Sequence, residues 1–136
     1  MDLLRRLCVP APTSFEYAVI RVVPRVEREE FLNAGIILFS LENRFLKALV
    51  QVDENRLRAL APDADLPPIH DHLQAFEKVC LGVGDAGPIA RLSQRERFHW
   101  LVSPRSTVIQ VSPVHGGLCE DPERTLEQLF RRLVTV

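Results

Sequence analysis

The segment from Tyr17 to Val23 places the strongest constraint on how this chain can fold. It is rich in β-branched residues and ends at Pro24, which is the pattern of a β-strand. Alternate side chains of a strand point to opposite faces, and both faces of this segment are apolar except at Arg21. The pattern predicts a central strand that helices cover on one side. Arg21 must then have a partner or an opening to solvent, because an isolated buried charge is costly.

Several other segments have the periodicity of strands or helices. Strands are predicted at 36–39, 45–52 and 107–111, with a short edge strand at 89–92, whereas residues 114–117 are predicted to be a turn or loop. One helical turn is expected within 25–33, and longer helices are expected at 53–61, 67–80, 94–102 and 122–134. The order predicts an α+β fold, with an antiparallel or mixed β-sheet and helices packed mainly on one face.

Two helix starts have specific sequence signals. Ser93 and Glu96 have the spacing of a capping box, in which each side chain binds the other's backbone N–H. Asp121 is a good N-cap, and Pro122 suits the first helical position because its missing N–H would have no partner there. The last helix then presents one apolar stripe, formed by Leu126, Leu129, Phe130, Leu133 and Val134.

Composition limits the classes of function. The chain has 136 residues and 46% hydrophobic residues, which fits a flexible leader at 1–14 and a single domain at 15–136. No segment approaches the roughly 20 apolar residues that cross a bilayer. The net charge of −1 argues against a general electrostatic grip on nucleic acid, although a local patch of arginines remains open.

The cysteines and histidines do not form a recognisable metal or redox motif. Cys8, Cys80 and Cys119 are far apart and odd in number, which indicates a reducing, cytoplasmic compartment. His70 and His72 are two residues apart on a predicted helix, so their side chains diverge by about 200° and cannot share a metal. We expect no cofactor and no metal, and no catalytic residues are assigned.

Two polar segments stand out as candidate ligand-binding regions. The first contains Arg21, Glu30 and Asn33 around a strand end and a turn, and the second contains Arg105, Ser106, Gln110 and His115. An arginine next to hydroxyl groups can bind an anion through charge-assisted hydrogen bonds. The alternative is that these side chains only hold turns together and satisfy loop backbone.

The same segments resemble the DUF3037 family, a bacterial family of unknown function. The resemblance covers roughly residues 15–134, and its markers are 17–24, 28–35, 97–107, Gln110, 112–115 and Asp121-Pro122. The family has Thr where this chain has Gly116, which weakens any site around His115. The resemblance implies no activity. It implies one partner, a HipA-like kinase, because some relatives are encoded beside such kinases.

Three hypotheses follow. The leading one is a non-enzymatic accessory or protein-interaction module, which includes a homodimer, and it predicts an exposed apolar patch. The alternative is a small enzyme or ligand-binding protein for an anionic small molecule, and it predicts that Arg21, Glu30, Asn33, Arg105 and His115 converge on one cleft. The third is weak nucleic-acid binding through arginines.

Overall fold

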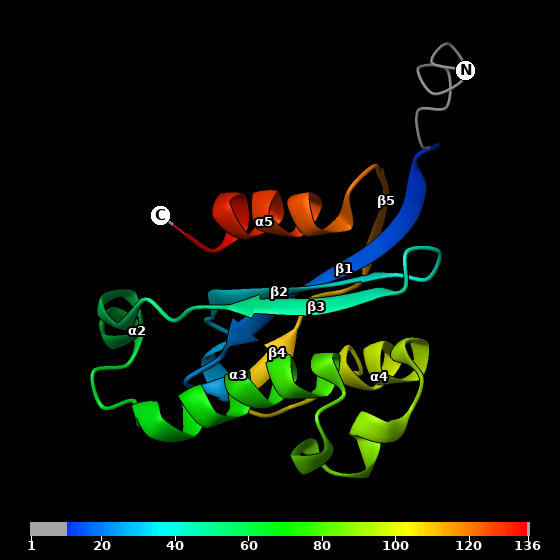
Figure 1. The fold of residues 1–136 in the computed structure, drawn as a ribbon. Coiled ribbons are helices and arrows are strands. Elements are labelled where there is room, and N and C mark those ends of the chain that lie inside the picture. The colour runs from blue at the N-terminus through cyan, green and yellow to red at the C-terminus, as the bar shows by residue number, and fades with distance from the viewer. Residues whose placement is uncertain (1–10, 136) are drawn as a thin grey trace, which may run out of the picture.

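The computed structural model describes residues 11–135, which form one five-stranded sheet between two layers of helices (Figure 1). The strands are β1 (Thr13–Val22), β2 (Leu32–Ser40), β3 (Phe45–Val50), β4 (Ile109–Val111) and β5 (His115–Cys119). The helices are α2 (Glu54–Leu60), α3 (Leu66–Leu81), α4 (Gln94–Leu101) and α5 (Pro122–Leu133), with 3-10 turns η1 (Val26–Arg28), η2 (Gly84–Ala86) and η3 (Pro88–Arg91). The predicted α+β class is confirmed, and all strand pairs are antiparallel.

β1 is the centre of the sheet, as its two apolar faces predict, but helices cover it on both sides and not on one side only. It pairs with β2 along one edge, while β4 and then β5 pair along its other edge. Between β4 and β5 the Ser112 hydroxyl accepts a hydrogen bond of 2.8 Å from the Val19 N–H. The hydroxyl thereby replaces a backbone carbonyl where Pro113, which has no N–H, interrupts the ladder.

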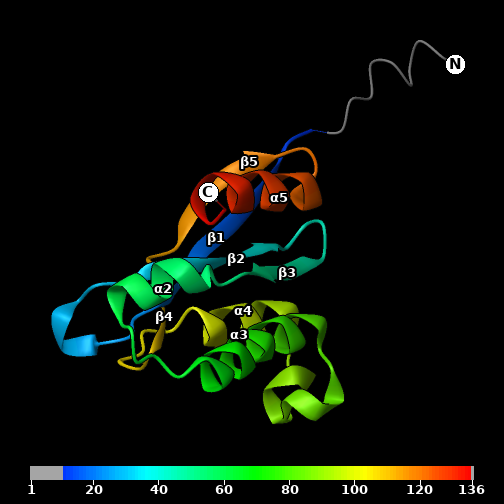
Figure 2. The ribbon, with the colours of Figure 1, turned by 90° about the vertical axis from the view of Figure 1, so that its left-hand side faces the viewer.

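The two faces of the sheet bury separate apolar cores. Ala18, Ile20 and Val22 of β1 pack in the core that α3 and α4 cover, while Phe15 and Val19 pack in the core that α5 covers. Figures 1 and 2 show α3 and α4 on one side of the sheet and α5 alone on the other. Within residues 11–135, no helix is both long and apolar enough to span a membrane.

Both ends of α5 are tied to the sheet. Near its first turn, Glu123 forms an ion pair of 2.6 Å with Lys47 of β3. Near its last turn, the Leu133 carbonyl accepts a hydrogen bond of 3.0 Å from the Asn33 amide of β2. These contacts fix where the helical cover of this face begins and where it ends.

The helix starts predicted from sequence are confirmed. The capping box of Ser93 and Glu96 is complete, and the Asp121 carboxylate accepts hydrogen bonds from the first turn of α5. The single turn expected within 25–33 is η1.

Three local predictions are wrong. Residues 88–91 form η3 rather than an edge strand, because Pro88 follows Gly87, whose φ of 89° turns the chain. Residues 115–119 form β5 rather than a loop. Pairing with β1 overrides the low strand propensity of the two glycines, and the Phe15 ring fills the space where Gly117 lacks a side chain. The sequence predicts a flexible leader at 1–14. Its residues 1–10 lie outside the described residues, whereas Thr13 and Ser14 belong to β1.

Gly35 is required where β2 lies between β1 and β3. A Cβ at this position would lie 2.7 Å from the Leu49 carbonyl oxygen and 2.9 Å from Val50 Cγ1. The obstacle on one side is backbone, which cannot rotate away.

We therefore expect Gly35→Ala to lower the free energy of unfolding by about 1–3 kcal/mol, the usual cost of overpacking. Gly116→Ala is the matched control, because its nearest neighbour would be the Phe15 carbonyl oxygen at 3.6 Å. The control should change stability by less than about 0.5 kcal/mol. Urea unfolding measures both, and equal losses in the two variants would contradict the steric argument.

Candidate functional site

Four of the seven candidate residues line one pocket at the end of β1. This cavity of about 360 Å³, called the Arg21 pocket below, is lined by Arg21, Val23, Val26, Glu29, Phe31, Arg105, Ser106 and Gln110. The sheet brings two of them together directly, since Arg21 of β1 pairs with Gln110 of β4. The others come from the turn after β1 and from the loop between α4 and β4.

Arg21 is the most unusual side chain of the pocket. Its guanidinium carbon lies 4.1 Å from the centre of the Phe31 ring, a cation–π contact, and Phe31 itself is 46% exposed. Among residues 11–135, Arg21 Nε is the one buried side-chain nitrogen or oxygen without a hydrogen-bond partner. A buried donor of this kind normally has a hydrogen-bond partner, so Arg21 Nε is exceptional among these side chains.

Arg105 also lines the pocket, but its guanidinium is already engaged. It donates to the carbonyls of Leu101 at 2.5 Å and Trp100 at 2.9 Å, which lie in the last turn of α4. It also lies against the Trp100 and Phe76 rings, with distances of 4.9 and 5.4 Å to their centres. Burial lowers the pKa of Arg105 below its ordinary value. Its main role is therefore to close α4 and join it to α3, while its charge still reaches the pocket.

Gln110 and Ser106 complete the polar side of the pocket. The Gln110 amide nitrogen donates to the Thr107 carbonyl at 2.9 Å, which leaves the amide oxygen as an acceptor. Ser106 is exposed. Glu29 is the only acidic residue in the lining, and it has a left-handed backbone conformation with a φ of 56°.

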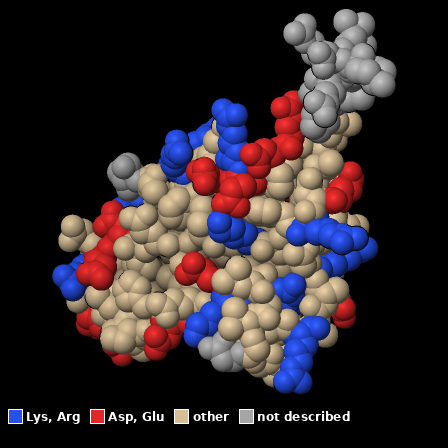
Figure 3. Space-filling view, in the orientation of Figure 1, with Lys and Arg blue, Asp and Glu red and all other residues tan. Residues whose placement is uncertain are grey.

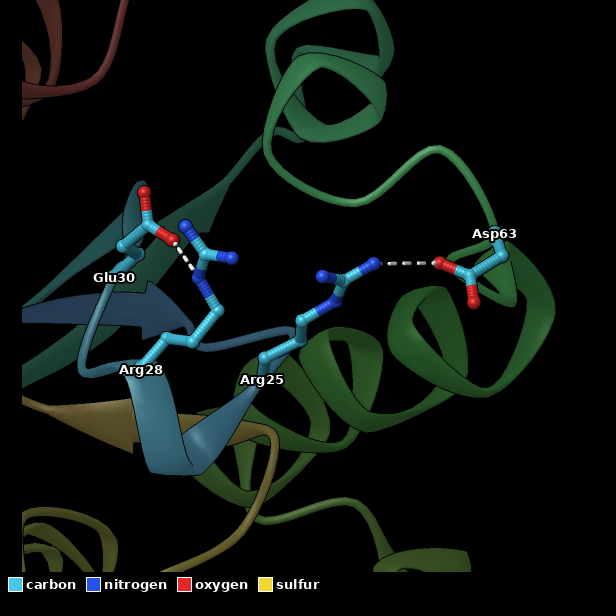
Figure 4. Close-up of polar contacts among 4 residues, drawn as sticks. All are labelled: Arg25, Arg28, Glu30 and Asp63. Atoms are coloured by element: carbon cyan, nitrogen blue, oxygen red, sulfur yellow. Dashed lines mark hydrogen bonds and ion pairs between the residues drawn. The ribbon is translucent and has the colours of Figure 1, made fainter.

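The other three candidates do not line this pocket, although Asn33 of β2 pairs with Arg21 of β1. Glu30 pairs with Arg28 at 2.5 Å (Figure 4), and Asn33 donates to the end of α5. The His115 ring lies 5.3 Å from the Tyr17 ring, in the middle of β1. The convergence expected of Arg21, Glu30, Asn33, Arg105 and His115 is therefore wrong for Glu30, Asn33 and His115. These three serve the turn, the helix end and the edge of the sheet.

A second and larger pocket lies beside the first and was not predicted. This cavity of about 550 Å³, called the Ile69 pocket below, is lined by Pro24, Arg25, Ala61, Asp63, Ala64, Asp65, Pro68, Ile69, His72, Thr107, Val108 and Ile109. Its lining comes from three segments far apart in sequence, and no motif marks any of them. Arg25 and Asp63 form an exposed ion pair of 3.5 Å between two of these segments (Figure 4).

The histidines of α3 do not converge. His70 Nε2 lies 3.6 Å from the Glu54 carboxylate, whereas His72 contacts the Phe76 ring. Burial, and secondarily the positive charge of Arg105, lowers the pKa of His72. Among the side chains that the structure describes, no group of three or more His, Cys, Asp or Glu is placed to hold a metal ion.

Arg97 is a buried structural arginine that was not identified from the sequence. Arg97 donates to the carbonyls of Val79, Cys80 and Leu92, and thereby joins the end of α3 to α4. Burial raises the pKa of the neighbouring Cys80 thiol to about 12, despite the opposing effect of Arg97. A thiol with such a pKa is not a nucleophile at neutral pH.

Charge on the surface is mixed. On the face drawn in Figure 3, basic and acidic side chains lie interspersed over the helices and the sheet. Such a surface gives the third hypothesis, nucleic-acid binding, no continuous basic track on this face.

We expect Arg105→Met to lower the free energy of unfolding by about 1.5–3 kcal/mol, because the final carbonyls of α4 lose charged hydrogen bonds. Arg105→Lys should recover only part of this loss, since an ammonium cannot reproduce the fork that reaches both carbonyls. Thermal and urea unfolding of the two variants test this. Wild-type stability in Arg105→Met would show that the capping role is wrong.

A family model described as a protein of unknown function, DUF3037, matches residues 17–134. No curated protein and no solved structure matches the chain.

Proposed function

The chain belongs to the DUF3037 family, whose description assigns no activity, and we propose that it is a non-enzymatic interaction module that binds an acidic group of a partner protein at the Arg21 pocket. The observation that carries this proposal is the Arg21 guanidinium, which lies over the exposed Phe31 ring and has a buried Nε without a hydrogen-bond partner. A carboxylate accepts from a guanidinium through two parallel hydrogen bonds, and the terminal nitrogens of Arg21 are the donors that a partner's carboxylate would meet.

The surroundings of Arg21 favour an anion. Arg105 adds a second positive charge, and Ser106 adds a hydroxyl donor. Glu29 opposes an anion, but it is exposed and therefore screened by solvent. The pocket has an apolar wall of Val23, Val26 and Phe31, which limits the water that competes for the guanidinium.

A protein partner is favoured by the exposed apolar surface at the same place. Phe31 is 46% exposed and Val26 is 39% exposed, and both line the Arg21 pocket. Aromatic and arginine side chains dominate the binding energy of many interfaces, where a rim of other residues excludes water. Arg21 stacked on Phe31 is such a pair.

The energetics of Arg21 separate a binding role from a structural one. Leaving Nε buried and unpaired costs about 1–3 kcal/mol, whereas the cation–π contact returns only about 0.5–1 kcal/mol at an exposed site. We therefore expect Arg21→Met to unfold at the same urea concentration as the wild type or at a higher one. A large loss of stability would indicate that Arg21 serves the fold.

Binding is tested with tagged wild type, Arg21→Met and Arg95→Met, each recovered from the native cell with its bound proteins. Arg95 is the matched control, because it is an exposed arginine of α4 outside the Arg21 pocket. We expect one protein to be recovered with the wild type and with Arg95→Met and to be lost with Arg21→Met. With that protein purified, Arg21→Met should weaken the Kd at least about 30-fold, since such a pair contributes about 2 kcal/mol or more.

The same experiment distinguishes the alternatives. The HipA-like kinase that the family resemblance implies is the first purified partner to test. Identical proteins recovered with all three forms would contradict the proposal. A small anionic metabolite recovered with the wild type, and displaced in Arg21→Met, would instead favour a ligand-binding protein.

A further inference from the structure

The Arg21 pocket and the Ile69 pocket lie on opposite sides of one thin wall. Two segments build this wall, residues 23–26 and residues 105–108, and the Val23 N–H donates to the Val108 carbonyl at 2.6 Å between them. Neighbouring residues of each segment line different pockets. Val23 and Val26 face the Arg21 pocket, whereas Pro24 and Arg25 face the Ile69 pocket. The second segment is divided in the same way, with 105–106 on one side and 107–108 on the other.

The Ile69 pocket has the chemistry of a site for an apolar side chain. Ile69 and Ile109 form buried parts of its lining, and the small side chains of Ala61 and Ala64 leave the space open. Val108 lines the pocket and is 38% exposed. Val26 and Phe31 are exposed on the other side of the wall, so apolar side chains are exposed on both of its sides.

The opening of the Ile69 pocket can adjust at little cost. Arg25 comes from the turn after β1, and Asp63 comes from the loop between α2 and α3 (Figure 4). Their ion pair is long, at 3.5 Å, and both side chains are well exposed, at 41% and 85%. Such pairs contribute little to stability, so the two segments can separate when a side chain enters.

We infer that the two pockets together bind one extended segment of a partner protein, which places an acidic side chain on Arg21 and an apolar side chain in the Ile69 pocket. This inference rests on the proposed function and adds the second half of the recognition. A compact small molecule cannot fill two cavities that a wall of backbone separates, whereas a chain that crosses the wall can.

The wall also limits the spacing of the two side chains. Two adjacent backbone segments with their side chains are roughly 10 Å across, from the spacing of paired strands and packed layers. An extended chain advances about 3.3–3.6 Å per residue. The acidic and apolar residues of the partner should therefore be about three positions apart.

The probe is a displayed library of random 12-residue peptides, selected on the wild type and on four variants. Arg21→Met removes the guanidinium, Ala64→Phe fills the Ile69 pocket without adding charge, and Val108→Glu makes its rim acidic. Leu118→Glu is the matched control for the last change, because Leu118 is 71% exposed on β5, outside both pockets. Urea unfolding confirms that each variant is folded before selection.

We expect the wild type and Leu118→Glu to enrich peptides with an acidic and an apolar position at one fixed spacing. Arg21→Met should lose the acidic preference, while Ala64→Phe and Val108→Glu should lose the apolar one. A selected peptide is then synthesised with its apolar residue replaced by Ala. This replacement should weaken binding to the wild type by about tenfold or more and binding to Ala64→Phe by less than about twofold, as expected when the two groups are in contact.

The outcomes separate the inference from the proposed function. An acidic preference without an apolar one at fixed spacing, or an apolar preference that Ala64→Phe retains, overturns the inference and leaves the Arg21 site standing. A wild-type selection without an acidic preference, or one that Arg21→Met does not change, overturns both.

Discussion

The pairing of β1 on both of its edges is the constraint on which the rest of this structure depends. β2 takes one edge, β4 and β5 take the other, and apolar side chains of β1 enter the cores on both faces. The helices α3, α4 and α5 pack against the sheet that this strand organises. A charged residue within such a strand is tolerated only where the cover ends. Arg21 is at that point. It pairs with Asn33 of β2, whose amide donates to the carbonyl of Leu133, the last residue of α5.

Much of the fold could be predicted because its signals are local. The strand at 17–23 has two apolar faces, α5 has one apolar stripe, and α4 has a capping box that the structure completes. β5 could not be predicted, since Gly116 and Gly117 disfavour a strand and only the pairing with β1 and the contact with Phe15 make one. Local sequence patterns therefore gave the wrong secondary structure for a segment whose conformation depends on pairing with another strand.

The site divides in the same way. Arg21 could be singled out because a charge inside an apolar strand is visible in the sequence, and Gln110 follows from its strand. Glu30 and Asn33 lie near Arg21 along the chain, yet each is bound to another partner, which only the coordinates of Arg28 and Leu133 reveal. The Ile69 pocket gave no signal, because its walls are ordinary alanines, prolines and isoleucines from separate segments.

Three arginines of this chain show why Arg21 is different in kind. Arg97 and Arg105 both donate to carbonyls in the last turns of helices, where the helix dipole favours their charge. Each of these two arginines stabilises the fold through hydrogen-bond acceptors that the chain itself supplies. Arg21 has only an aromatic ring beneath it and a buried Nε without an acceptor. At a strand position flanked by Ile20 and Val22, an apolar side chain would avoid that cost, so packing within the fold does not by itself account for an arginine there.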